Sequence, residues 1–178
     1  IQGGAQGPGN EDDVTLEPGS ALSVQLTRGD VTIGAVGTVT TVDDGRVLAF
    51  GHPLLGNGAV RFVLSSASIT AIVPSDVVPF KLANIGRSVL GIIDQDRPAA
   101  VGGALGDGPA MIPVSLHVHA PAGTRDYALA VVPDERLSPH LVPAAPPELT
   151  HKALSATTAA PAEHAWTPPA GRDTSRNP

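Results

Sequence analysis

Short runs of alternating apolar and polar residues, separated by Gly and Pro, extend from about Ser20 to Leu141. Ser20–Leu26 alternates small or polar residues with apolar ones, as expected for a strand with one buried face. Val31–Val42 is rich in β-branched residues and is interrupted by Gly34 and Gly37, which predicts a strand with a bend or bulge at one of these glycines.

A β-hairpin is the clearest local prediction. The segment Asp43-Asp44-Gly45 is a turn sequence in which Gly45 suits the left-handed position of a three-residue loop. Arg46–Phe50 then returns as the partner strand. The hairpin therefore spans Gly37 to Gly51.

The remaining apolar runs predict further strands and an all-β fold. These runs are Val60–Val73, Ser88–Asp94, Met111–Ala120 and Asp126–Val132. The Gly-rich stretch Gly102–Gly108 lacks the Lys-Ser/Thr ending of a phosphate-binding loop, so we expect it to form a tight crossing between strands. The body is expected to be a barrel or a sandwich of short strands.

Both ends of the chain differ in composition from this body. Residues 1–18 are rich in Gly and acidic residues and predict a flexible lead-in. Residues 143–178 are rich in Ala and Pro and poor in large aliphatics, which predicts a disordered tail with at most a short helix around Glu148–Ala156. One domain over residues 19–142 is therefore expected.

Composition narrows the classes of function. Hydrophobic residues make up 42% of the 178 residues and charged residues 16%, which is typical of a folded globular protein. A net charge of −6 and an aromatic content of 3% argue against nucleic acid as a partner. The sequence contains no stretch of roughly 18 or more apolar residues, so it predicts no membrane span. With no Cys, the chain has no disulfide, thiol nucleophile or Cys-ligated zinc.

The segment Ala49-Phe50-Gly51-His52-Pro53 is the strongest candidate for chemistry. We expect the preceding strand to place His52 at the rim of a sheet. Gly51 before it allows close backbone approach, and Pro53 after it ends the strand. An imidazole in this place could act as a general base, because its pKa lies near neutral. The alternative is a His that caps the strand and bonds a loop carbonyl.

This segment carries a resemblance to a known family. Gly37-Thr38-Val39-Thr40, a short Asp/Gly turn and then Ala49-Phe50-Gly51-His52 resemble the core motif of the sporulation stage IV B (SpoIVB) serine peptidases, and especially their bacterial relatives outside spore formers. The order of later segments is also similar: a Ser/Thr-rich strand, Pro79–Ala83, Gln95–Pro98, Val101–Gly106 and Ile112-Pro113-Val114. The resemblance covers roughly Pro18 to Leu141.

The resemblance implies a trypsin-like double β-barrel fold and a Ser-His-Asp mechanism in which His52 is the general base. The family's nucleophile lies in a Gly-x-Ser-Gly motif near the C-terminus, and this chain has no such sequence. Ser75, in a Pro-Ser-Asp turn, is the best substitute, but no Gly-rich loop flanks it to supply oxyanion N–H groups. Asp134 resembles the family's catalytic Asp only faintly, and we interpret it as a turn carboxylate.

Two other clusters have structural explanations that we prefer. His117 and His119 share one face of a strand, which a zinc site could use, but no third ligand is evident. An amphipathic strand explains both without a metal. Asp94 and Asp96 could form a carboxylate pair for acid–base work, although Arg97 and the following Pro favour an ion-paired loop. We therefore expect no metal and no cofactor.

Two functions remain open. The first is a serine-peptidase-like domain that retains His52 but is incomplete and inactive as this chain stands. The second is a non-catalytic binding or scaffold domain. Both imply a protein or peptide as the substrate or partner. The resemblance and the first residue, Ile rather than Met, predict a location outside the cytoplasm, downstream of a removed segment.

Overall fold

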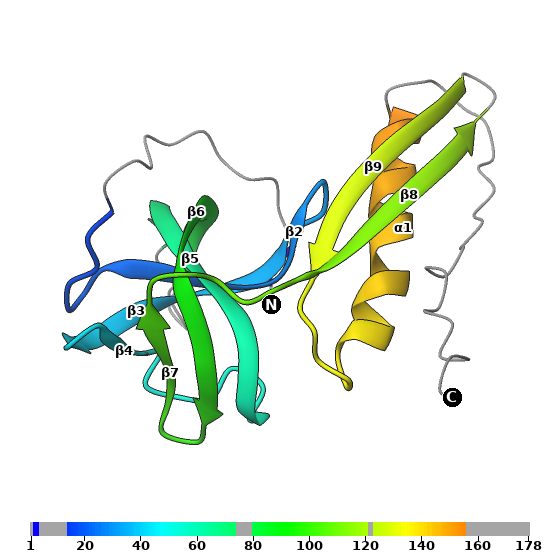
Figure 1. Cartoon of the computed structure of the whole chain (residues 1–178). Helices are drawn as coiled ribbons and strands as arrows, with labels where there is room; N and C mark the ends of the chain where they lie inside the picture. Colours follow the sequence, from blue (N-terminus) through cyan, green and yellow to red (C-terminus); the bar gives the residue numbers. More distant parts are fainter. Residues whose placement is uncertain (1, 4–13, 74–79, 121–122, 156–178) are drawn as a thin grey trace, which may run out of the picture.

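The computed structural model describes residues 2–3, 14–73, 80–120 and 123–155, and these form strands and one helix (Figure 1). In chain order the elements are β1 (Gln2–Gly3), β2 (Ala21–Gly29), β3 (Ile33–Asp43), β4 (Arg46–Ala49), β5 (Gly58–Val73), β6 (Phe80–Arg97), β7 (Ala100–Leu105), β8 (Ile112–Ala120), β9 (Gly123–Val131) and α1 (Ser138–Ser155). Every strand pairing is antiparallel. The prediction of an all-β fold is confirmed.

The strands form one sheet that closes on itself. Their order is β1-β3-β4-β7-β6-β5-β2-β9-β8, and β2 pairs in addition with β3. This extra pairing joins β2, β3, β4, β7, β6 and β5 into a ring, while β1 and the β8–β9 hairpin lie outside it. In Figure 1 the ring lies on the left and the hairpin, with α1 against it, on the right.

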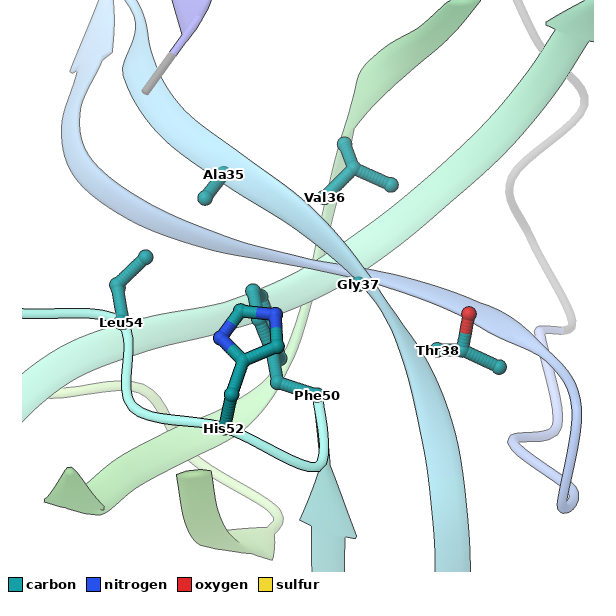
Figure 2. A pocket seen from close by; sticks show the side chains of 7 residues that line it. All are labelled: Ala35, Val36, Gly37, Thr38, Phe50, His52 and Leu54. Carbon is teal, nitrogen blue, oxygen red and sulfur yellow. The ribbon is translucent and has the colours of Figure 1, made fainter. Parts of the chain in front are cut away.

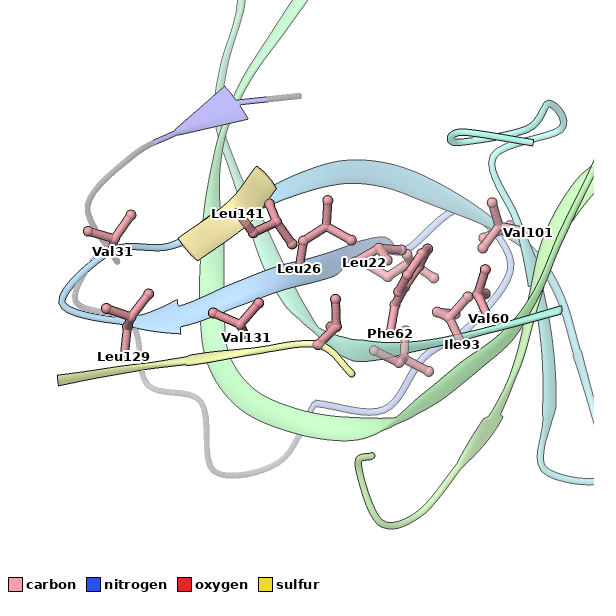
Figure 3. Packing of buried hydrophobic residues seen from close by; sticks show 14 of the residues in the cluster. Leu22, Leu26, Val31, Val60, Phe62, Ile93, Val101, Leu129, Val131 and Leu141 are labelled. Atoms are coloured by element: carbon pink, nitrogen blue, oxygen red, sulfur yellow. The ribbon is translucent and has the colours of Figure 1, made fainter. Parts of the chain in front are cut away.

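A single apolar cluster runs from the ring into the hairpin (Figure 3). Inside the ring its largest fully buried side chain is Phe62, surrounded by aliphatic residues from β2, β6 and β7, among them Leu22, Ile93 and Val101. At the other end Leu129 of β9 belongs to the same cluster. The ring and the hairpin therefore share one core, because neither is separated from the other by a polar layer.

Strand β2 is buried on both faces. Leu22, Val24 and Leu26 belong to the core, while Ser23 and Gln25 on the opposite face are also fully buried. Hydrogen bonds compensate for the burial of the Ser23 hydroxyl and the Gln25 amide nitrogen, whereas Gln25 Oε1 has no partner among the described residues. The Ser23 hydroxyl bonds that of Ser65 at 2.6 Å and donates to the Ser66 carbonyl at 2.8 Å, and the Gln25 amide donates to the Ser65 hydroxyl and the Gly86 carbonyl at 2.7 Å each.

The predicted hairpin is present as β3 and β4, but its loop is shorter than expected. Asp43 pairs with Arg46, so the loop contains only Asp44 and Gly45, both with positive φ (44° and 71°). Positive φ at both loop residues is the mark of a type I′ turn, for which Asp-Gly is a preferred sequence.

One of the two irregularities along β3 lies beside Gly34, one of the glycines where we predicted a bend or bulge. There the β2–β3 register shifts between Gln25 and Thr27, which pair with Gly34 and Ile33, and a second shift lies between Val39 and Thr41 in the β3–β4 pair. Gly34 also permits close packing, because a Cβ on it would lie 2.5 Å from the Val24 carbonyl oxygen.

Two other segments also differ from expectation. Ala100–Leu105 is the regular strand β7, paired with both β4 and β6, although we predicted a crossing over Gly102–Gly108. Gly103 permits this pairing, because a Cβ there would lie 2.3 Å from the Ile92 carbonyl oxygen. Strand β6 begins at Phe80, eight residues before the predicted Ser88.

The predicted disordered tail begins instead as part of the fold. Residues 143–155 belong to α1, which contacts β8 and β9 and buries Leu141, Ala145 and Leu149 at a spacing of four. The composition predicted disorder because a segment rich in Ala and Pro with few large aliphatics was expected to bury too little apolar surface. Packing of the apolar stripe overrides that local preference. Residues 156–178 lie outside the described residues.

The predicted lead-in also contributes to the fold. Leu16 is buried in the core, and Gln2 and Gly3 pair with Gly34 and Ile33 of β3. A side chain of Leu size buries enough apolar surface to order its segment against the barrel. Residues 4–13 lie outside the described residues.

The helix α1 should contribute measurably to stability. Replacing Leu149 by Ala leaves a cavity between α1 and the hairpin, which we expect to lower the free energy of unfolding by about 2–4 kcal/mol. Urea denaturation checks this value. The exposed His140 of the same helix is the control, and His140→Ala should change it by less than about 0.5 kcal/mol. Equal effects of the two substitutions would contradict the packing of α1.

Candidate functional site

The chain turns sharply where β4 ends, and this turn presents His52. The Phe50 N–H donates to the Thr38 carbonyl at 3.0 Å, and Phe50 and Gly51 then adopt φ of +73° and +69°. A bulky residue with positive φ is uncommon and strained. The role of Gly51 differs from the close backbone approach that we predicted: it takes the left-handed conformation, and a Cβ there would meet nothing within 4 Å.

A buried carboxylate holds the loop that follows. Asp96 of β6 is 1% exposed and accepts the N–H groups of Leu54 at 2.8 Å, Leu55 at 2.8 Å and Asn57 at 3.2 Å. Bonds from several amides to one carboxylate are strong because the acceptor is charged. Asp94 and Asp96 therefore do not act as a pair, because Asp96 binds the loop that carries His52.

Asp94 has a different role. Its carboxylate forms a bidentate ion pair with the Arg46 guanidinium of β4 on the outer surface. Arg46 Nη1 lies 2.7 Å from Oδ2, and Nη2 lies 2.9 Å from Oδ1. Hydrogen bonding to Asp94, and secondly its charge, raise the pKa of Arg46 above its ordinary value. The partner is thus Arg46 and not the adjacent Arg97, which bonds Gln95 at 2.8 Å.

A pocket of about 410 Å³ lies between β3 and this loop (Figure 2). Its lining is Ala35, Val36, Gly37, Thr38, Phe50, His52 and Leu54. The Phe50 ring packs directly on Gly37, where a Cβ would lie 2.4–2.7 Å from three ring carbons. The lining combines apolar side chains, those of Ala35, Phe50 and Leu54, with polar surface that includes Thr38 and His52.

Two contacts orient the His52 ring. Its plane stands at 84° to that of Phe50, with ring centroids 5.6 Å apart, and its Nδ1 lies 2.8 Å from the Pro53 carbonyl oxygen. A carbonyl can only accept a hydrogen bond, so this contact assigns the proton to Nδ1. Nε2 is then an acceptor, the form that a general base or a receiver of ligand N–H groups requires.

The other sequence candidates lie elsewhere or are bound in the fold. Ser75 lies outside the described residues. Ser65 and Ser66 are buried in the polar cluster behind β2 and do not line the His52 pocket. The Asp134 carboxylate accepts the N–H groups of Arg136 at 3.0 Å and Leu137 at 3.1 Å, which is the geometry of a cap at the start of a helical turn.

The two hairpin histidines share an exposed face, as the spacing predicts. His117 bonds Asp126 at 2.6 Å and His119 bonds Thr124 at 2.9 Å, each across the β8–β9 pair. Leu116 and Val118 are buried on the other face. Within the described ranges, no group of three His, Asp or Glu residues could hold a metal ion. In the same ranges, no helix has the length and apolarity to cross a membrane.

Sequence reasoning found His52 but missed its surroundings. Asp96 was interpreted as part of a solvated loop, and the contact between Gly37 and Phe50 was not anticipated. The Asp96 contacts join residues about 40 positions apart, so no local pattern indicates them. The contact between Gly37 and Phe50 lies within the predicted hairpin and depends on the left-handed turn at its end. A comparison of the chain with protein-family models, with curated proteins and with solved structures finds no match.

The Asp96 carboxylate should be essential to the loop. Asp96→Ala leaves three amides without their acceptor, and we expect it to lower the free energy of unfolding by at least about 2 kcal/mol. Amide hydrogen exchange of Leu54, Leu55 and Asn57 should accelerate. Asp94→Ala, on the same strand, removes an exposed ion pair worth less than about 1 kcal/mol and is the control. Unaltered exchange in Asp96→Ala would contradict the role assigned to the carboxylate.

The absence of a side chain at Gly37 should shape the pocket. In Gly37→Ala the new methyl group overlaps the Phe50 ring, so the ring moves and its edge contact with His52 is lost. NMR cross-peaks between the two rings should disappear, with a stability loss of about 1–3 kcal/mol. Gly102→Ala is the control, because its nearest contact is an ordinary 3.4 Å. Retained cross-peaks in Gly37→Ala would show that the ring is not held by this contact.

Proposed function

We propose that this chain is a peptidase-like β-barrel domain that binds segments of other proteins at the His52 pocket and does not hydrolyse them by itself. The observation that carries the proposal is the pocket, in which an oriented imidazole with an accepting Nε2 stands beside an apolar floor. A combination of apolar side chains and a few polar groups is typical of a recognition site.

The acids of the chain that sequence analysis singled out support binding rather than catalysis. Asp96 uses both carboxylate oxygens to hold the loop, and Asp134 caps a turn. His52 itself bonds the Pro53 carbonyl through the nitrogen that a catalytic Asp would engage in a triad. Each group thus has a structural task that competes with the triad role.

The resemblance to the SpoIVB serine peptidases supports a protein or peptide as the ligand and a location outside the cytoplasm. It rests on two segments, Gly37–Thr40 within β3 and Ala49–His52 at the end of β4 and in the turn that follows. In this proposal His52 is retained from a peptidase site and serves recognition.

Hydrolysis is the second candidate, and the Nε2 acceptor of His52 favours it. In that function His52 takes the proton of a serine hydroxyl as the oxygen attacks a carbonyl carbon. A reactive fluorophosphonate distinguishes the two functions. The binding proposal predicts an unchanged intact mass, whereas one adduct on the wild type that is absent in His52→Ala would establish the enzyme.

Binding is tested with peptides selected from a random octapeptide phage library. We expect His52→Ala to weaken binding of a selected peptide about tenfold, equivalent to roughly 1.4 kcal/mol, because the rim of the pocket is lost. Fluorescence polarisation gives the dissociation constants. His117→Ala, on the exposed face of the hairpin, is the control and should leave them unchanged. Failure to select a peptide, or equal effects of both substitutions, would overturn the proposal.

A further inference from the structure

We propose that Arg136 is a positioning residue for the His52 pocket: it binds the Asn57 carbonyl and so holds the loop that carries His52 in the form that binds a ligand. This inference rests on the proposed function and adds to it a residue outside the pocket lining. Because Arg136 lies in the turn between β9 and α1, the ligand affinity of the pocket depends on a segment that does not line it.

The corner where the loop enters β5 is held weakly by its own sequence. Gly56 and Gly58, on either side of Asn57, have φ of +73° and +77°. Glycine populates many backbone conformations, so contacts from other segments must select this one. Those contacts are made to the N–H and the carbonyl of Asn57.

Two charged side chains bind these groups from different parts of the fold. The Asp96 carboxylate of β6 accepts the Asn57 N–H at 3.2 Å, which is longer than its bonds of 2.8 Å to the N–H groups of Leu54 and Leu55. On the other side, Arg136 Nη2 donates to the Asn57 carbonyl at 3.0 Å. Hydrogen bonds from a charged guanidinium are roughly twice as strong as neutral ones. The corner is therefore held between β6 and the turn that precedes α1.

Arg136 is itself held in place by its own turn. The Asp134 carboxylate, whose side chain is 10% exposed, accepts the backbone N–H of Arg136 at 3.0 Å and lies 4.0 Å from its Nε. The Ser138 N–H donates to the Asp134 carbonyl at 2.8 Å where α1 begins, and the Val132 N–H donates to the Leu26 carbonyl of β2 at 2.9 Å. Because the turn is fixed at both ends, the guanidinium loses less conformational entropy when it binds the loop.

The corner is connected to the pocket through the backbone of the loop. Leu54 belongs to the pocket lining, and Figure 2 shows its side chain beside the same space as those of Phe50 and His52. The His52 ring is bonded to the Pro53 carbonyl at 2.8 Å, so a change in the backbone between Pro53 and Leu54 also turns the imidazole. Loss of the Arg136 bond therefore affects both the lining and the orientation of His52.

Amide hydrogen exchange tests the positioning role without a ligand. Arg136→Met keeps the aliphatic stem but removes the donor, and we expect exchange of Leu55 and Asn57 to accelerate about threefold to tenfold. Arg136→Lys keeps a charged donor, which suffices for one carbonyl, so exchange should stay within about twofold of the wild type. Arg125→Met, at an exposed position of β9, is the control and should leave the loop unchanged.

Peptide affinity and the His52 resonances provide the second measurement. For a peptide selected in the binding test, Arg136→Met should raise the dissociation constant about threefold to fivefold, and Arg136→Lys by less than about twofold. The imidazole resonances of His52 should shift in Arg136→Met. The urea midpoint should move by less than about 0.5 M, because a bond made by an exposed side chain contributes little to global stability.

The outcomes separate this inference from the proposed function. A peptide whose binding requires His52 but not the Arg136 donor would overturn the positioning role and leave the binding proposal intact. Unchanged loop exchange in Arg136→Met, or equal effects of Arg136→Met and Arg136→Lys, would also overturn it. If no peptide is selected, the proposed function fails, and loop exchange still decides whether Arg136 holds the Asn57 corner.

Discussion

Closure of the sheet through β2 is the constraint on which the rest of the structure depends. Strand β2 pairs with β3 and β5 to close the ring and with β9 to attach the hairpin. The side chains on both faces of β2 are buried, so the polar groups of Ser23 and Gln25 need partners inside the protein. Hydrogen bonds to Ser65, Ser66 and the Gly86 carbonyl supply these partners, except at Gln25 Oε1, and they tie β5 and β6 to the closing strand.

The candidate site arises where the ring leaves an edge unfinished. Strand β4 is short, and the positive φ of Phe50 and Gly51 carries the chain away from β3 before the pairing is complete. The strained turn persists because the structure beyond it is held strongly, with Asp96 accepting three loop amides from the core side. The carboxylate that holds this loop therefore also helps to keep His52 at the rim of the pocket.

The arrangement of His52 supports the binding role that we propose for it. The bond from Nδ1 to the Pro53 carbonyl orients the ring and leaves Nε2 as an acceptor, without engaging a carboxylate. The contact with Phe50 keeps the ring beside the apolar floor.

The sequence by itself determined the features that depend on local stereochemistry. Alternation predicted the strands and the two faces of β8, and Asp44-Gly45 predicted a hairpin because few other residues tolerate positive φ. Ala49–Pro53 indicated His52 at the end of a strand. Only the tertiary structure decided the rest. The Ala- and Pro-rich composition of α1 predicted disorder, but Leu141, Ala145 and Leu149 are buried in the core. The task of Asp96 depends on a loop about 40 residues away in the chain, so no local pattern indicates it.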